Sequence, residues 1–275
     1  MRRLLFTVIL IGVVVLAGCK KGDSSPTGAT LPTTPSNPAV TNASGQPGPN
    51  VSSIPNYGGM MATIQYDYST PAFPPSIPSY TLSFILGFAQ FGSGVDAGVV
   101  SVGTDTLIKQ TAGSTTYYMN NFTSGGTGLK SVDFLNGSEH NWTVSGSGSV
   151  SAMASGLYTL TPRTPFTINS PADGTTIVKA NDLTITWTNT SPSPSDSILI
   201  VIVGPGGSYM KSGIAASGTS QGYTVASNDL GTMTGTCYLQ MVKYRYNVVT
   251  VTVNSIIKKY VVLAEIVKQK TINLQ

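Results

Sequence analysis

The sequence predicts an all-β protein built from two tandem β-sandwich domains. Apolar and polar residues alternate with period two in stretches such as residues 63–68 and 80–88, as expected for strands with one buried face. Glycine, serine, asparagine and aspartate separate these stretches at the short, regular spacing typical of sandwiches and barrels. No helical periodicity of useful length competes with this pattern, and only 9% of the residues are charged.

The chain begins with a pattern typical of a removable export signal, which we place at residues 1–18. Arg2 and Arg3 precede an uncharged run from Leu4 to Ala17. As a helix this run would span about 21 Å, which is short of the ~30 Å hydrocarbon core of a bilayer. The segment is therefore expected to be cleaved rather than to remain as a membrane helix.

The end of this segment, Leu16-Ala17-Gly18-Cys19, resembles the lipobox of bacterial lipoproteins. The resemblance implies cleavage before Cys19 and attachment of palmitate-type acyl chains to that residue, which would anchor the protein to a membrane. In that family Lys20, rather than aspartate, at the second mature position implies the outer membrane. Lys20, Lys21 and Asp23 are also similar to the charged tether that exports some lipoproteins to the cell surface. The alternative is a solvated basic pair beside lipid headgroups.

Residues 19–56 are predicted to form the lipidated cysteine and a flexible tether. Prolines recur among Ser, Thr, Gly and Asn, and no aromatic residue occurs before Tyr57. Such a composition cannot bury enough apolar surface to offset the chain entropy.

The rest of the chain divides into a sandwich at residues 57–162 and a second one at residues 163–275, with Pro162 and Pro165 marking the boundary. In the first sandwich, Asn136-Gly137 predicts a hairpin. A three-residue loop would pair Phe134 with His140 and keep the apolar side chains on one face. His140 is then a partly buried sheet residue rather than a catalytic base.

The second sandwich resembles fibronectin type III domains and is immunoglobulin-like. The resemblance covers residues 166–257 and rests on Trp187 in the second strand and on Gly235-Thr236 before Tyr238, with Val242 four residues later. It implies that Trp187 fills the core and that Tyr238 forms a corner. Gln240 departs from the apolar residue that the family prefers, and residues 258–274 add a strand that the family lacks.

Catalytic residues, metal ligands and cofactors are not predicted. The sequence has no nucleophile elbow, zinc-binding helix or phosphate-binding glycine loop. Its acids adjoin turn residues, which favours turns over acid-base pairs. Once Cys19 is lipidated, Cys237 has no disulfide partner, and it is expected to act as a small apolar residue in a strand. We therefore expect a protein that is not an enzyme.

The aromatic residues of the first sandwich are the candidates for a binding site. Sugars stack on exposed aromatic rings and bond to amide side chains, and the candidate residues are Tyr117, Tyr118, Trp142, Asn120 and Asn121. Adjacent tyrosines in a strand point to opposite faces, so one of Tyr117 and Tyr118 is expected to be exposed. The alternative is that the aromatic rings belong to the core.

The charge distribution argues against nucleic-acid binding. The formal charge of +4 falls to +2 when Arg2 and Arg3 leave with the signal (15 − 2 = 13 basic against 11 acidic residues). Basic residues remain near the C-terminus, at Lys243, Arg245, Lys258, Lys259, Lys268 and Lys270, against Glu265. They are expected to protect exposed strand edges, and the alternative is a face for anionic glycan or lipid.

Together these features predict an outer-membrane lipoprotein, with the cell surface as the favoured side. Its role would be non-catalytic, in adhesion, assembly or envelope structure. The alternative is a glycan-binding lipoprotein of a nutrient-uptake system. The expected partners are the membrane, through the lipid, and an envelope protein or a glycan.

Overall fold

The structure is a computed structural model that describes residues 40–41, 47–69, 81–92, 95–120, 128–129, 132, 134, 138–160, 166–253 and 255–275. Almost every regular element in these residues is a strand, so the predicted all-β fold is confirmed. The two helical elements are short 3-10 turns, η1 (Val51–Ser53) and η2 (Ser227–Leu230).

The strands before residue 163 are β1 (Val40–Thr41), β2 (Tyr57–Ser69), β3 (Thr81–Gln90), β4 (Val100–Val102), β5 (Asp105–Thr106), β6 (Ile108–Ala112), β7 (Thr115–Met119), β8 (Glu139–Val144) and β9 (Met153–Leu160). The later strands are β10 (Phe166–Ser170), β11 (Thr175–Ile177), β12 (Leu183–Asn189), β13 (Ser197–Gly204), β14 (Gly207–Ala215), β15 (Ser220–Val225), β16 (Gly235–Val253) and β17 (Ile256–Leu274). The stretches at 63–68 and 80–88 that alternate in sequence fall in β2 and β3, apart from residue 80, which lies outside the described residues.

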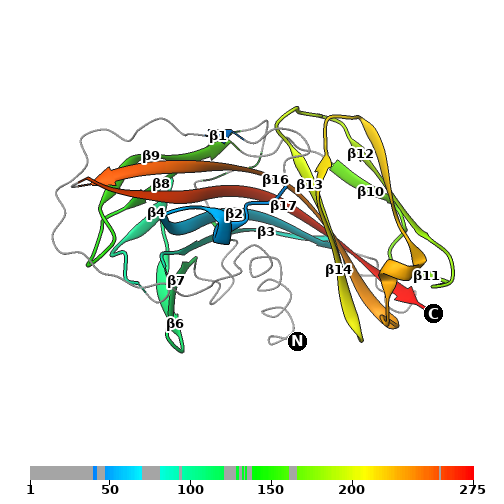
Figure 1. Ribbon diagram of the computed structural model, residues 1–275. Helices are drawn as coiled ribbons and strands as arrows, with labels where there is room; N and C mark the ends of the chain where they lie inside the picture. The colour runs from blue at the N-terminus through cyan, green and yellow to red at the C-terminus, as the bar shows by residue number, and fades with distance from the viewer. Residues whose placement is uncertain are drawn as a thin grey trace.

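The strands form three sheets, and Figure 1 shows the two small ones at opposite ends of the long hairpin of the large one. The largest has ten strands, with the order β14-β13-β16-β17-β2-β3-β7-β6, and with β1 on β16 and β11 on β17. A three-stranded sheet has the order β10-β12-β15, and a four-stranded sheet has the order β5-β4-β8-β9. The two small sheets cover opposite ends of the large one.

The C-terminal hairpin of β16 and β17 joins the two ends of the molecule. Its strands have 19 residues each and pair without interruption from Gly235–Leu274 to Val253–Ile256. At about 3.3 Å per residue each strand is about 60 Å long. β13 pairs with the first part of β16, whereas β2 pairs in parallel with β17. The large sheet therefore contains strands from both sides of residue 163, and the boundary itself, residues 161–165, lies outside the described residues.

The alternation of side chains along β16 explains where the cores lie. Its odd-numbered residues face the small sheets: Cys237, Leu239 and Met241 pack against the three-stranded sheet, and Val249 and Val251 against the four-stranded sheet. Between these two apolar groups the same face carries Lys243, Arg245 and Asn247, which are buried. The even-numbered residues belong to a third apolar cluster on the opposite face of the sheet, which includes Val242, Tyr244 and Tyr246.

The segment of residues 47–56, called the strap here, crosses this opposite face of the hairpin. β1 pairs with β16 on one side of the hairpin and β2 pairs with β17 on the other, so the chain between them passes over both strands. Pro49 and Val51 are buried, and the Tyr246 hydroxyl donates a hydrogen bond to the Pro47 carbonyl at 3.3 Å. The prediction of a flexible tether up to residue 56 is therefore wrong for the strap. The few apolar side chains of this polar segment pack against the apolar face of the hairpin, which holds the segment in place.

The second half contains the expected sandwich. The three-stranded sheet packs on strands β13, β16 and β17, and Trp187 is buried in the cluster between them. Cys237 is also buried there, as predicted. Residues 256–274 form β17, which confirms the additional strand. Tyr238 lies on the opposite side of β16 from Cys237 and is half-buried.

Candidate functional site

The tyrosines predicted to bind sugar do point to opposite faces of β7, but neither is exposed. Tyr118 is 1% exposed, and its hydroxyl donates to Asp96 Oδ1 at 2.9 Å and accepts from the Ala97 N–H at 2.7 Å. Burial raises the pKa of Tyr118. Tyr117 is half-buried, and its ring stacks on Phe88 with centroids 6.2 Å apart.

The other candidates near these tyrosines are buried as well. Trp142 is 1% exposed in the core under the four-stranded sheet, and within the described residues its indole N–H has no hydrogen-bond partner. Asn120 accepts a bond from the Gly87 N–H at 2.9 Å and donates to the Ile85 carbonyl at 3.2 Å. Asn121 lies outside the described residues. The exposed stacking platform that a sugar site needs is therefore not formed by Tyr118 and Trp142, because both rings fill the core.

His140 is held inside the sheet rather than presented to a substrate. It is 1% exposed, its Nδ1 is 2.7 Å from Thr63 Oγ1, and its ring meets the edge of Phe134 at 4.9 Å between centroids. The ladder partner of His140 is Thr159 of β9, and Phe134 lies in no strand, so Phe134 and His140 meet through their rings rather than as the predicted ladder pair. The loop residues 135–137 lie outside the described residues.

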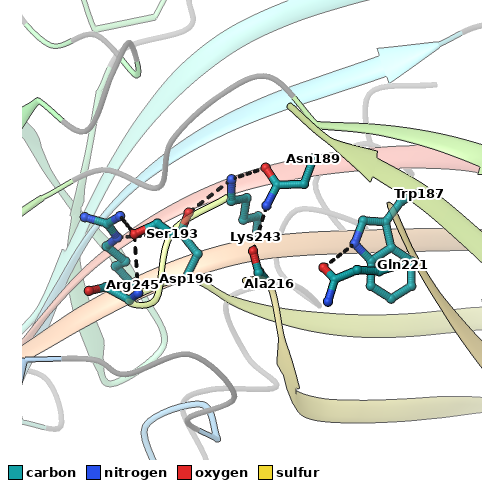
Figure 2. A network of polar contacts seen from close by, with 9 residues as sticks. Trp187, Asn189, Ser193, Asp196, Ala216, Gln221, Lys243 and Arg245 are labelled. Atoms are coloured by element: carbon teal, nitrogen blue, oxygen red, sulfur yellow. Dashed lines mark hydrogen bonds and ion pairs between the residues drawn. The ribbon is translucent and has the colours of Figure 1, made fainter. Parts of the chain in front are cut away.

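Two of the basic residues expected at strand edges are instead buried in a polar network, which Figure 2 shows. Asp196 is ion-paired with Lys243 Nζ at 3.0 Å and with Arg245 Nε. The prediction of edge protection is therefore wrong for Lys243 and Arg245, which lie in the middle of the large sheet. Lys258, Lys259, Lys268 and Lys270 are only partly buried.

Neutral partners complete this network. Arg245 Nη2 donates to Ser193 Oγ at 2.7 Å, and Lys243 Nζ donates to Asn189 Oδ1 at 2.9 Å. Asn189 Nδ2 in turn donates to the Ala216 carbonyl at 2.7 Å. Nearby, the Trp187 indole donates to Gln221 at 3.2 Å. All residues of this network follow residue 163, and Asp196 and neutral acceptors compensate the two cations, so the network is suited to stabilising this part of the sheet rather than to chemistry.

A second buried polar feature, which the sequence analysis missed, lies on the other face of the hairpin. Glu265 is 3% exposed and borders a cavity of about 200 Å³ between the strap and the sheet. Burial raises the pKa of its carboxyl group to about 8. A single acid in the apolar alternation of Val261, Leu263 and Val267 was the available signal for it.

Within the described residues, no group of three or more His, Cys, Asp or Glu side chains is placed to hold a metal ion. None of the helices in that part of the chain is long and apolar enough to cross a bilayer.

No protein-family model matches the sequence, and no curated protein matches it. Solved structures with some similarity include a Ca²⁺-stabilised adhesin with which an Antarctic bacterium binds ice. It has 12% identity and a TM-score of 0.22, with 80% of this chain and 50% of that chain covered. This chain thus spans half the length of that adhesin chain.

Two further structures with some similarity are a set of fibronectin(III)-like modules and a second ice-binding adhesin. Fibronectin(III)-like modules of Clostridium thermocellum CbhA have 10% identity and a TM-score of 0.19, with 78% of this chain and 93% of that chain covered. A bacterial ice-binding adhesin of 1.5 MDa, described for its retention at the host cell surface, has 16% identity and a TM-score of 0.18, with 78% and 66% covered. At TM-scores this low no function passes from these proteins to this chain.

Proposed function

We propose that the protein is an outer-membrane lipoprotein that faces the cell surface and has a non-catalytic role in adhesion, assembly or envelope structure. The lipobox at Leu16–Cys19 supports the anchor. The continuous hairpin of β16 and β17 carries the architectural part of the proposal. It links both ends of the molecule into one sheet about 60 Å long.

The environment of the reactive side chains agrees with a non-catalytic role. His140 and Cys237 are buried in the sheets, and burial raises the pKa of the Cys237 thiol, so it is a poor nucleophile at neutral pH. The glycan-binding alternative has no specific observation in its favour among the described residues, since Tyr118 and Trp142 present no free ring face.

The anchor is tested by fatty-acid labelling in cells. The wild-type protein should incorporate an alkyne-tagged fatty acid and partition into the detergent phase, and Cys19→Ala should do neither. Cys237→Ala is the matched control, because these two are the only cysteines of the chain, and it should label normally. Labelling that persists in Cys19→Ala would contradict the proposal.

The surface orientation and the role need a second experiment. Protease added to intact cells should remove the wild-type protein without breaking the outer membrane. Cells that carry Cys19→Ala should produce folded protein but lose attachment or envelope integrity. Full protection from protease, or normal attachment without the anchor, would refute these parts of the proposal.

A further inference from the structure

The cavity under the strap has an acidic floor and a neutral lining. Glu265 pairs across the hairpin with Tyr244, and both side chains lie on the face that the strap covers. Among the described residues, the remaining lining consists of Gly48, Pro49, Asn50, Val51, Ser52, Leu199, Met210 and Ser212. Glu265 is therefore the only Asp, Glu, Lys, Arg or His side chain in this described lining.

The carboxyl group of Glu265 has no partner within the described residues. No hydrogen bond or ion pair to it is formed there, and burial alone accounts for the raised pKa. Lys243 and Arg245, which flank the cross-strand partner Tyr244, are directed to the opposite face and held by Asp196, and Lys268 on β17 is paired with Asp67. An acidic residue that is only 3% exposed and has no compensating contact is costly to bury, and such groups gather at functional sites.

The surrounding strands are shaped to leave this space open. The pairing of β13 with β14 shifts register between Ile198 and Ile200, and the extra residue lies in β14, where Gly213 has a φ of 74°. The Tyr244 hydroxyl is hydrogen-bonded to the Gly213 backbone and to the Ser197 side chain, which holds the ring at the wall of the cavity. Bulges of this kind often occur beside binding sites because they redirect side chains.

The entrance lies at the edge of the strap. Met210 is 53% exposed, and Asn50 and Ser52 are exposed as well, so the rim reaches solvent while the carboxyl group remains inside. The cavity of about 200 Å³ is smaller than the ~300–1,000 Å³ typical of pockets for drug-sized ligands. It therefore suits a group of the size of one long side chain.

We propose that this cavity binds an alkylammonium group, with the ammonium head on Glu265 and the alkyl stem against Val51, Leu199 and Met210. One carboxylate balances one positive charge, and apolar walls suit a methylene stem better than a hydrated ion. Ca²⁺ would need 6–8 oxygen ligands, which a single carboxylate does not supply. The ammonium group can belong to a free amine or to a lysine side chain of a protein partner.

Binding at neutral pH would release a proton. The buried carboxyl group is protonated when the cavity is empty, and it gives its proton to solvent when the ammonium ion enters, so the charges balance in the complex. The titratable groups of the described apolar cluster on that face are phenols, which include those of Tyr244 and Tyr246 on β16 and of Tyr57 and Tyr66 on β2. β2 places Ile64 opposite Glu265. This inference does not depend on the lipid anchor, and its failure would leave the proposed function intact.

The composition of the chain allows a direct test by NMR. The sequence has only two glutamates, Glu139 and Glu265, so labelling with [δ-¹³C]glutamate of the full chain in mild detergent gives two carboxyl signals. Saturating n-butylammonium should lower the apparent pKa of the Glu265 carboxyl group by about one unit or more. A shift of one unit means that the ammonium ion binds about tenfold more tightly to the ionised carboxylate than to the protonated acid. The exposed Glu139 is the internal control and should not shift. An equal effect of n-butanol, or no effect of butylammonium, would overturn the proposal.

Two variants separate binding from folding. Glu265→Gln keeps the shape of the side chain and should weaken butylammonium binding by about tenfold or more while the fold is retained. Met210→Trp, at an exposed rim position, should block entry and leave the pKa of Glu265 high. Retained affinity in both variants would refute the site. A comparison of the affinities of butylammonium and of a lysine-containing peptide then identifies the source of the ammonium group. If the natural ligand is a lysine of a protein partner, the peptide should bind at least as tightly as butylammonium.

Discussion

The two faces of the hairpin at its middle residues offer a comparison between two buried polar regions. On one face Asp196 is paired with Lys243 and Arg245, and further polar groups hold these cations. On the other face Glu265 borders a cavity and has no bonded partner within the described residues. The first region has the satisfied geometry of a structural junction. The second carries a desolvation cost that no contact offsets, which is why we assign it to a ligand.

The largest expected effect is a pH dependence of stability that comes from Glu265. Its pKa is about 8 in the folded protein against a usual value of 4.5, so the folded state binds the extra proton between these limits. The contribution of Glu265 to the free energy of unfolding should therefore be highest below pH 4.5, fall by up to about 1.4 kcal/mol per unit towards pH 8, and change no further above it. Urea denaturation at several pH values measures this slope.

Glu265→Gln isolates the contribution of that one group. The difference in unfolding free energy between the variant and the wild type should grow in favour of the variant as the pH rises from 4.5 to 8. Glu139→Gln, at an exposed position, should follow the wild type throughout. Parallel curves for Glu265→Gln and the wild type would show that the carboxyl group is not buried in its neutral form.

Removal of the anion from the other face should destabilise the protein by about 3–5 kcal/mol. Asp196→Ala leaves Lys243 and Arg245 buried without a counter-charge, and the loss of one partner from a buried ion pair is much more costly than the pair is worth. The effect is measured by urea denaturation near pH 7.

Asp229→Asn is the control for this substitution, because Asp229 is exposed and should tolerate the change within about 0.5 kcal/mol. If Asp196→Ala cost no more than the control, the network of Figure 2 would not contribute to the stability of the fold.

The sequence predicted well those features that depend on local alternation. Strands β2, β3, β7 and β8 follow from period two, and Trp187 and Cys237 lie in the core as their strand positions indicate. Alternation reports only that a side chain lies on one face or the other. It does not report how deeply each face is buried, which is why Tyr118 is fully buried and Tyr117 on the other face is half-buried rather than exposed.

The positions of the charges could not be read from the sequence because they depend on long-range pairing. Lys243 and Arg245 alternate along β16 like edge residues, but β13 supplies one neighbouring strand and the loop before it supplies Asp196. The strap was missed for a related reason. Its polar composition is that of a linker. Pro49 and Val51 are buried only because they lie against an apolar face of the hairpin, which follows about 200 residues later in the sequence.

The smallest expected effect concerns an ion pair that lies outside both buried regions. Lys109 Nζ and Asp96 Oδ2 are 2.9 Å apart, but the two side chains are 51% and 48% exposed. Lys109→Ala should therefore cost about 0.5 kcal/mol or less in urea denaturation, since solvent screens such pairs. The pKa of Asp96, which is about 2, should rise in this variant, because Lys109 is its strongest partner. The carboxylate keeps its bonds from the Gly98 N–H and the Tyr118 hydroxyl, so this rise should be partial. A loss as large as that of Asp196→Ala would mean that distance, rather than burial, decides the strength of an ion pair in this protein.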